Sequence, residues 1–157
     1  MWNFLELTKP RITSLILVCT AVGYLFGYGP PFSLHTLVHV LIGTALMASG
    51  TSALNQWWEA DSDGRMHRTR QRPIPSGRMK RSSALMFGVA LSSIGFIWLW
   101  LGTNALAAML GLFTLLTYLF LYTPLKTVSA LSTTIGAVPG AMPPLIGFAA
   151  ASVVYSK

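Results

Sequence analysis

From Ile12 to Trp58 the chain reads ITSLILVCTAVGYLFGYGPPFSLHTLVHVLIGTALMASGTSALNQWW, without one Asp, Glu, Lys or Arg. Two further charge-free runs follow, from Ser82 to Leu125 and from Thr127 to Ser156. Such runs are typical of membrane proteins, because a helix needs roughly 20 predominantly apolar residues to cross the hydrocarbon core. The first two runs are each long enough for two helices and the third for one. The sequence therefore predicts five membrane spans.

Turn sequences divide the two longer runs. Gly27-Tyr28-Gly29-Pro30-Pro31 interrupts the first run and Gly102-Thr103-Asn104 the second, and both combinations end helices and turn the chain. We therefore expect an all-α fold, a polytopic transmembrane helical bundle, in which residues 1–157 form a single membrane domain. The predicted spans cover residues 12–28, 36–57, 83–101, 105–122 and 131–153.

The composition agrees with this fold class. Hydrophobic residues make up 53% of the chain and charged residues only 10%, whereas ordinary soluble domains are about 25% charged. A disordered chain is excluded by the same numbers. The single cysteine, Cys19, lies inside the first predicted span, so the chain cannot form an internal disulfide or a multi-cysteine metal site. We expect Cys19 to be a small buried apolar residue.

The basic residues predict the orientation in the membrane. Lys9 and Arg11 precede the first span, seven Lys and Arg residues lie between positions 59 and 81, and Lys126 follows the fourth span, whereas the two intervening turns have none. Short loops rich in Lys and Arg stay on the cytoplasmic side. We therefore expect a cytoplasmic N-terminus in a bacterial inner membrane, surrounded by lipid. The net charge of +7 is then mostly a topology signal, and it gives little support to a nucleic-acid partner.

Three of the four acidic residues lie together at the end of the second span. Asn55, Glu59 and Asp63 recur every four residues, so they share one face if the helix continues, while Asp61 points elsewhere. Carboxylate and amide oxygens near a membrane surface suit Mg2+, which commonly uses one or two carboxylates and takes its other ligands from water and substrate phosphates. The spacing predicts a site for Mg2+ and a diphosphate.

Four arginines follow these acids and could add bidentate contacts to phosphate oxygens. They are Arg65, Arg68, Arg70 and Arg72. The alternative is a solvated loop in which the arginines only set topology and the acids are incidental. The register of the three oxygen-bearing side chains and the concentration of acids favour a site.

The motif Asn55-x3-Glu59-x3-Asp63, followed by Met66-x-Arg68-Thr69-x2-Arg72-Pro73 and Gly77, resembles the first acidic motif of the UbiA-type intramembrane prenyltransferases. The motif is most similar to the branch of this family that farnesylates protoheme, in which the central acid is Glu and not Asp. Three further stretches agree with the resemblance and extend it over almost the whole chain. They are Leu7-Thr8-Lys9-Pro10-Arg11, Tyr122-Thr123-Pro124-Leu125-Lys126 and the segment from Gly136 to Gly147.

The resemblance implies an enzyme that transfers a farnesyl group from farnesyl diphosphate to protoheme IX, giving haem O, with Mg2+ assisting the loss of diphosphate. Haem would then be a substrate, and terminal oxidase assembly factors would be candidate partners. By position, Asn55, Glu59 and Asp63 would bind the metal and be catalytic, as would Lys126. Arg68, Arg72 and Lys126 would bind the diphosphate and neutralise its charge.

One departure from the family pattern concerns length. Family members are usually about twice as long and carry a second acidic motif, whereas no acidic residue follows Asp63 here. We therefore expect the chain to be the N-terminal part of a longer enzyme with the nine-helix UbiA-type fold. A natural truncation is the alternative, and the fragment alone would then be inactive.

An allylic cation requires aromatic faces and exclusion of water, so a cavity between the helices should carry aromatic side chains. Candidates for this lining are Trp57, Trp58, Tyr118 and Tyr122, with membrane-interface or packing roles as the alternative. The Gly- and Pro-rich fifth span is expected to be kinked beside the same cavity, or else to use its small residues for close helix packing.

Two other functions stay open from the sequence. One is an aromatic polyprenyltransferase of the same superfamily. The other is a non-catalytic membrane module that binds haem, lipid or an assembly partner.

Overall fold

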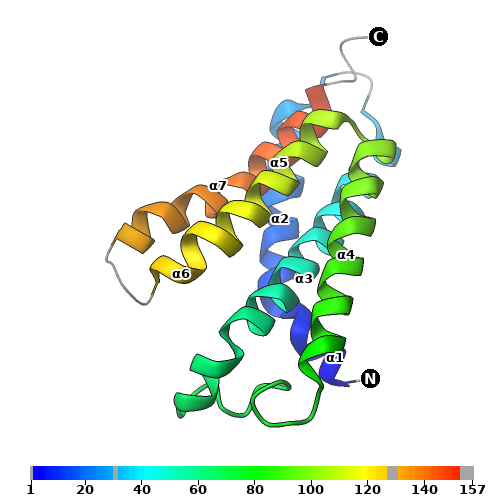
Figure 1. Cartoon of the computed structure of the whole chain (residues 1–157). Helices are drawn as coiled ribbons and strands as arrows, with labels where there is room; N and C mark the ends of the chain where they lie inside the picture. The colour runs from blue at the N-terminus through cyan, green and yellow to red at the C-terminus, as the bar shows by residue number, and fades with distance from the viewer. Residues whose placement is uncertain (1, 30–31, 127–130, 153–157) are drawn as a thin grey trace.

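A computed structural model of the chain describes residues 2–29, 32–126 and 131–152, and every regular element in these ranges is helical. Figure 1 shows the elements in chain order. They are α1 (Trp2–Thr8), α2 (Pro10–Gly27), α3 (Leu34–Arg65), α4 (Arg81–Gly102), α5 (Ala105–Leu116), the π-helix η1 (Thr117–Tyr122), α6 (Thr123–Leu125) and α7 (Leu131–Ser152).

The described residues contain five helices that are long and apolar enough to cross a membrane. These are α2, α3, α4, the continuous stretch Ala105–Leu125, and α7. The predictions of an all-α bundle and of five spans are confirmed, and the protein is a multi-pass membrane protein. Of the residues predicted to turn the chain, Pro30 and Pro31 lie outside the described ranges, whereas Thr103 and Asn104 separate α4 from α5 as expected.

Helix α3 is the central element and is longer than the predicted second span. Its 32 residues correspond to about 48 Å at 1.5 Å per residue, which exceeds a hydrocarbon core of about 30 Å. At its start, Ser33 caps the helix by accepting a hydrogen bond from the amide of Thr36, at 3.2 Å. The last turns of α3 therefore carry their side chains beyond the apolar core, into the region of the lipid headgroups.

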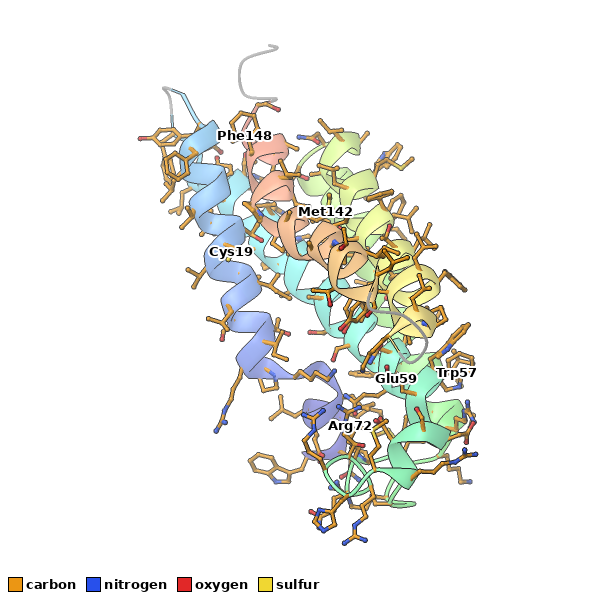
Figure 2. All side chains as sticks on the ribbon, turned by 90° about the vertical axis from the view of Figure 1, so that its left-hand side faces the viewer. Cys19, Trp57, Glu59, Arg72, Met142 and Phe148 are labelled. Carbon is orange, nitrogen blue, oxygen red and sulfur yellow. The ribbon has the colours of Figure 1, made fainter. Side chains whose placement is uncertain are left out.

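The helices pack closely where small residues meet. Gly50 of α3 lies against Ser92 and the backbone of Gly88 in α4, so that even a methyl group there would clash. Gly23 of α2 contacts the backbone of Pro144 in α7 in the same way. Figure 2 shows α2 and α7 converging near Phe148 and diverging toward the end of the molecule that holds Glu59.

The prolines of α7 do not interrupt the helix. The described helix runs from Leu131 to Ser152 with Pro139, Pro143 and Pro144 inside it. The proposed kink is therefore not accompanied by a break in helical structure, and the close contacts with α2 agree with the alternative role of the small residues in packing.

The fourth span also continues past its predicted end. The predicted fourth span ends at Tyr122, but the backbone widens into the π-helix η1 and continues as α6 to Leu125. A proline in a helix interior cannot donate its amide and its ring clashes with the carbonyl four residues earlier. Opening one turn to π geometry accommodates Pro124, and such π segments occur frequently at functional sites.

Candidate active site

Helix α3 continues beyond the predicted second span, and this continuation places Asn55, Glu59 and Asp63 on one buried face. Their exposed fractions are 2%, 8% and 4%. Asn55 Nδ2 donates a hydrogen bond to Glu59 Oε2 at 3.0 Å. Asp61 points away, as expected: its side chain is 74% exposed and pairs with Arg81 at 3.0 Å. The helix thus separates two buried carboxylates from one on the surface.

Two cations from distant parts of the chain compensate the buried carboxylates. Lys126 Nζ donates to Glu59 Oε1 at 2.9 Å. Arg72 Nη1 donates to Asp63 Oδ2 at 2.5 Å and lies 3.8 Å from Glu59 Oε2. Figure 2 shows Arg72 at the same end of the molecule as Glu59. These pairs are partly exposed, so both cations are accessible to an anionic ligand.

The local structure explains how Arg72 returns to α3. After the helix ends, the loop folds back in a series of turns, and Thr69 Oγ1 donates to the carbonyl of Asp63 at 3.0 Å. Thr69 and Pro73 are both buried. The loop therefore holds the guanidinium against the carboxylates instead of leaving it in solvent.

Helices η1 and α6 supply the other wall of the site. Thr123 Oγ1 donates to Asn55 Oδ1 at 2.9 Å, and Thr123 is buried. This contact fixes the Asn55 amide, which in turn donates to Glu59. The widened turn at η1 thus determines where Thr123 and Lys126 meet α3.

Lys9 is a site residue that the sequence assigned only to topology and to a family motif. It has left-handed backbone geometry, with φ 47° and ψ 64°, where among the described residues no other non-glycine has a positive φ. Burial, with the neighbouring Arg72 cation as the next cause, lowers the pKa of Lys9 below its ordinary value of 10.5. Gln56 Nε2 holds the preceding turn by donating to the Leu7 carbonyl at 3.1 Å. A strained, half-buried lysine is the signal that only the structure reveals.

Arg68 is not brought to the carboxylates. It is exposed, as are Arg65 at the end of α3 and Arg70 in the following loop, and none of these three guanidinium groups forms a hydrogen bond or ion pair with another described residue. The arrangement separates Arg72, which contacts the acids, from the other arginines of the cluster. A role for Arg68 in diphosphate binding stays a prediction.

A cavity of about 690 Å³ adjoins this cluster. Lys9, Tyr118 and Tyr122 line it, and the two tyrosine rings lie 5.0 Å apart. Trp57 and Trp58 are not among its lining residues: Arg81 covers the ring of Trp57, and Trp58 packs edge-on against Phe120 at 5.9 Å. Of the four aromatic candidates, the structure therefore places only the tyrosines in the cavity wall.

The expectation for Cys19 was wrong. Its side chain is exposed and lines the cavity. The reason lies in the packing of α2, whose first turns diverge from α7 while its last turns press against it. Cys19 lies on the open part, one residue before the buried Thr20.

This chain resembles known proteins over most of its length. The model of the UbiA prenyltransferase family matches residues 16–156, which is most of the chain. The chain belongs to the UbiA prenyltransferase family. It is 56% identical to the protoheme IX farnesyltransferase of Solibacter usitatus, over 97% of this chain and 55% of that protein. It is 45% identical to the protoheme IX farnesyltransferase of Myxococcus xanthus, over 94% of this chain and 50% of that protein.

Solved structures show the same fold. A UbiA homolog from Archaeoglobus fulgidus, bound to GPP and Mg2+, superposes with a TM-score of 0.75 at 18% identity, covering 99% of this chain and 54% of that one. The same homolog bound to DMAPP and Mg2+ gives a TM-score of 0.76. The chain spans about half the length of the curated relatives it matches.

The donor atoms of this UbiA family member fit a hard divalent cation. Within the described residues there is no cluster of three or more His, Cys, Asp or Glu that could hold a metal alone. Two buried carboxylates and one amide oxygen remain, and Mg2+ is commonly held by such a small set because it keeps water and phosphate ligands. The oxygen atoms of Glu59, Asp63 and Asn55 are therefore of the kind that Mg2+ accepts as ligands.

Proposed function

We propose that this chain is the N-terminal part of an intramembrane enzyme that transfers a farnesyl group from farnesyl diphosphate to protoheme IX, giving haem O. The observation that carries the proposal is the pair of buried carboxylates, Glu59 and Asp63, compensated by Lys126 and Arg72 at the end of an apolar cavity. The names of the relatives, all protoheme IX farnesyltransferases, support the choice of substrates. The part of these relatives that this chain does not match would correspond to the second half of such an enzyme.

In this proposal Asn55, Glu59 and Asp63 hold Mg2+ and through it the diphosphate. When bound, Mg2+ would offset the negative charge that develops on the leaving diphosphate. The Mg2+ and prenyl diphosphate in the solved UbiA homolog support this assignment. The hydrogen bond from Asn55 to Glu59 orients one carboxylate for the task.

The basic residues bind the diphosphate. Lys126 and Arg72 contact carboxylates in the free protein, and they would turn to phosphate oxygens once the substrate arrives, as charge-assisted bonds to phosphate are strong. We add Lys9, which faces the same space, and retain Arg68 as an outer contact. Together these cations stabilise the departing group, which is where negative charge grows in the transition state.

The cavity protects the prenyl group after the allylic C–O bond breaks. Its wall is mostly apolar, so stray water is kept from the allylic cation. Tyr118 and Tyr122 present ring faces that favour a cation. The vinyl group of protoheme would then form the new C–C bond with the farnesyl carbon, and water would add to the resulting cation with loss of a proton, giving the hydroxyethylfarnesyl side chain of haem O.

The charge distribution supports a location in the bacterial inner membrane with the N-terminus and the site on the cytoplasmic side. Residues 65–81, from the end of α3 to the start of α4, carry seven of the eleven Lys and Arg residues and lie at the same end as α1. Farnesyl diphosphate would thus reach the site from the cytoplasm. Assembly factors of terminal oxidases are the partners that would receive the product.

The proposal is tested with the protein expressed from its complete native reading frame. Membranes are incubated with Mg2+, farnesyl diphosphate and protoheme, and the haem products are separated and weighed by mass spectrometry. We expect a Mg2+-dependent product heavier than protoheme by one farnesyl group and one hydroxyl group, absent with Asp63→Asn and present with the surface variant Asp61→Asn.

Two other results would redirect the proposal. Prenylation of a small aromatic acid with haem untouched would identify an aromatic polyprenyltransferase. Haem binding without turnover, unchanged in Glu59→Gln and Asp63→Asn, would identify a non-catalytic membrane module.

A further inference from the structure

The cavity ends where α2 and α7 close against each other. Gly23 meets the backbone of Pro144, and Gly147 meets the backbone of Thr20, with no room for a methyl group at either position. Thr20 is fully buried. The seal is made of backbone, so a flexible side chain cannot move aside to let a longer ligand pass between the two helices.

The distance between the two ends of the cavity can be read along α2. Lys9, beside the carboxylates, and Cys19, just before the seal, both line the cavity. Ten residues separate them in the sequence, which corresponds to about 15 Å at a rise of about 1.5 Å per helical residue. In Figure 2, Cys19 lies on α2 well above the level of Glu59 and Arg72.

An extended farnesyl group has nearly this length. Its main chain of about twelve carbons spans about 14 Å, because bonds of about 1.5 Å advance about 1.25 Å each along a zigzag chain. By the same arithmetic a geranyl chain spans about 9 Å and a geranylgeranyl chain about 19 Å. Of these three chains, the farnesyl chain comes nearest in length to the distance from Lys9 to Cys19 along α2.

We propose that the seal between α2 and α7 measures the prenyl chain, and that Cys19 and Gly140 mark the point that the end of a farnesyl chain reaches. This inference rests on the proposed function, since it assumes that a diphosphate binds at the Lys9 end. Gly140 lies one helical turn before Pro144 and lines the cavity, and among the described residues nothing lies within 4 Å of a Cβ added there. The selected length is a property of this cavity and not of the diphosphate site.

The single cysteine gives a direct test on the unaltered protein. The purified chain in detergent is treated with N-ethylmaleimide at mildly alkaline pH, with Mg2+ and saturating dimethylallyl, geranyl or farnesyl diphosphate, and labelling of Cys19 is followed by mass spectrometry. We expect farnesyl diphosphate to slow labelling by about tenfold or more, because it alone covers the thiol. Dimethylallyl diphosphate should leave the rate unchanged while competing with farnesyl diphosphate for binding.

Two outcomes would overturn the inference. Equal protection by dimethylallyl and farnesyl diphosphate would mean that protection does not depend on chain length, and labelling of Cys19 in the farnesyl complex would place the chain elsewhere. Calorimetry distinguishes these from failure of the proposed function, because in that case none of the three diphosphates binds, and the inference is then wrong as well.

Variants that shorten the cavity provide a second test by calorimetry. Gly140→Leu and Cys19→Phe should raise the Kd for farnesyl diphosphate by about tenfold while leaving dimethylallyl diphosphate within about twofold of its original value. Retained dimethylallyl binding shows that the variant has folded. Val18→Phe is the matched control, because Val18 is exposed on α2 but is not part of the cavity wall. An equal loss of affinity for both ligands, or the same loss in Val18→Phe, would contradict the proposal that the seal limits the length of the prenyl chain.

Discussion

Lys126 Nζ lies 2.9 Å from Glu59 Oε1, although the two residues are separated by 67 positions in the sequence. The contact joins the end of the fourth span to the end of the second. Because Glu59 is only 8% exposed, its charge depends on partners that the fold brings to it. The same packing of α6 against α3 places Thr123 against Asn55. The site is therefore assembled by helix packing and not by one motif.

Removing one buried carboxylate should abolish Mg2+-dependent substrate binding. We expect Glu59→Gln and Asp63→Asn each to weaken binding of farnesyl diphosphate in the presence of Mg2+ by about 10–100-fold. Asp61→Asn, two residues or a little over half a turn from either residue, is exposed and paired with Arg81, and should bind as the original chain does. Calorimetry with and without Mg2+ measures the effect, and an equal loss in Asp61→Asn would point to general surface charge.

Arg72 and Asp63 should be coupled in stability as well as in binding. Arg72→Ala leaves the buried carboxylate without its 2.5 Å partner, so we expect the free energy of unfolding to fall by about 1–3 kcal/mol. The double variant Arg72→Ala/Asp63→Ala should recover part of that loss. Denaturation of the four proteins in one detergent gives the coupling energy, and strictly additive effects would show that the pair is energetically unimportant.

The lowered pKa of Lys9 predicts that the free energy of unfolding rises at alkaline pH. Burial lowers its pKa below 10.5, so between the lowered pKa and 10.5 the unfolded chain binds more protons than the folded one. Stability should therefore increase with pH through this window. Lys9→Met should be more stable than the original chain at neutral pH and should lose this part of the slope.

Binding of a diphosphate should have the opposite pH dependence at the same residue. An anionic ligand favours protonated Lys9, so affinity should fall as pH rises through the window, and Lys9→Met should flatten the change. Thermal unfolding and calorimetry across alkaline pH measure both trends. Identical pH profiles for the original chain and the variant would remove Lys9 from the site.

Two glycines in the wall between α2 and α7 should respond oppositely to a single methyl group. In Gly23→Ala the new Cβ meets the backbone of Pro144, and we expect a loss of about 1–3 kcal/mol in unfolding free energy. In Gly140→Ala the Cβ meets no described atom within 4 Å, and the variant should gain about 0.5–1 kcal/mol because alanine favours a helix over glycine. Equal melting temperatures for the two variants would contradict the observed close approach of α2 and α7.

Much of the fold could be predicted from the sequence because a membrane imposes strong local rules. The charge-free runs predicted five spans, and the turn at Thr103 and Asn104 lies where the composition indicated. The spacing of Asn55, Glu59 and Asp63 gave their shared face, since a helix repeats every 3.6 residues. The predicted ends of the second and fourth spans fell short of the helix ends at Arg65 and Leu125. A helix can continue beyond the end of an apolar run when a loop and neighbouring helices support it.

The sequence by itself determined the helices, their number in the described chain and the face on which the acids lie, because each depends on neighbours a few positions away. The tertiary structure alone decided which cations contact those acids, selecting Lys126 and Arg72, placing the strained Lys9 near them and leaving Arg68 in solvent. It also decided that Cys19 lines a cavity instead of being buried. These outcomes depend on where α2, α7 and the loop after α3 meet in space, and no local periodicity encodes such distances.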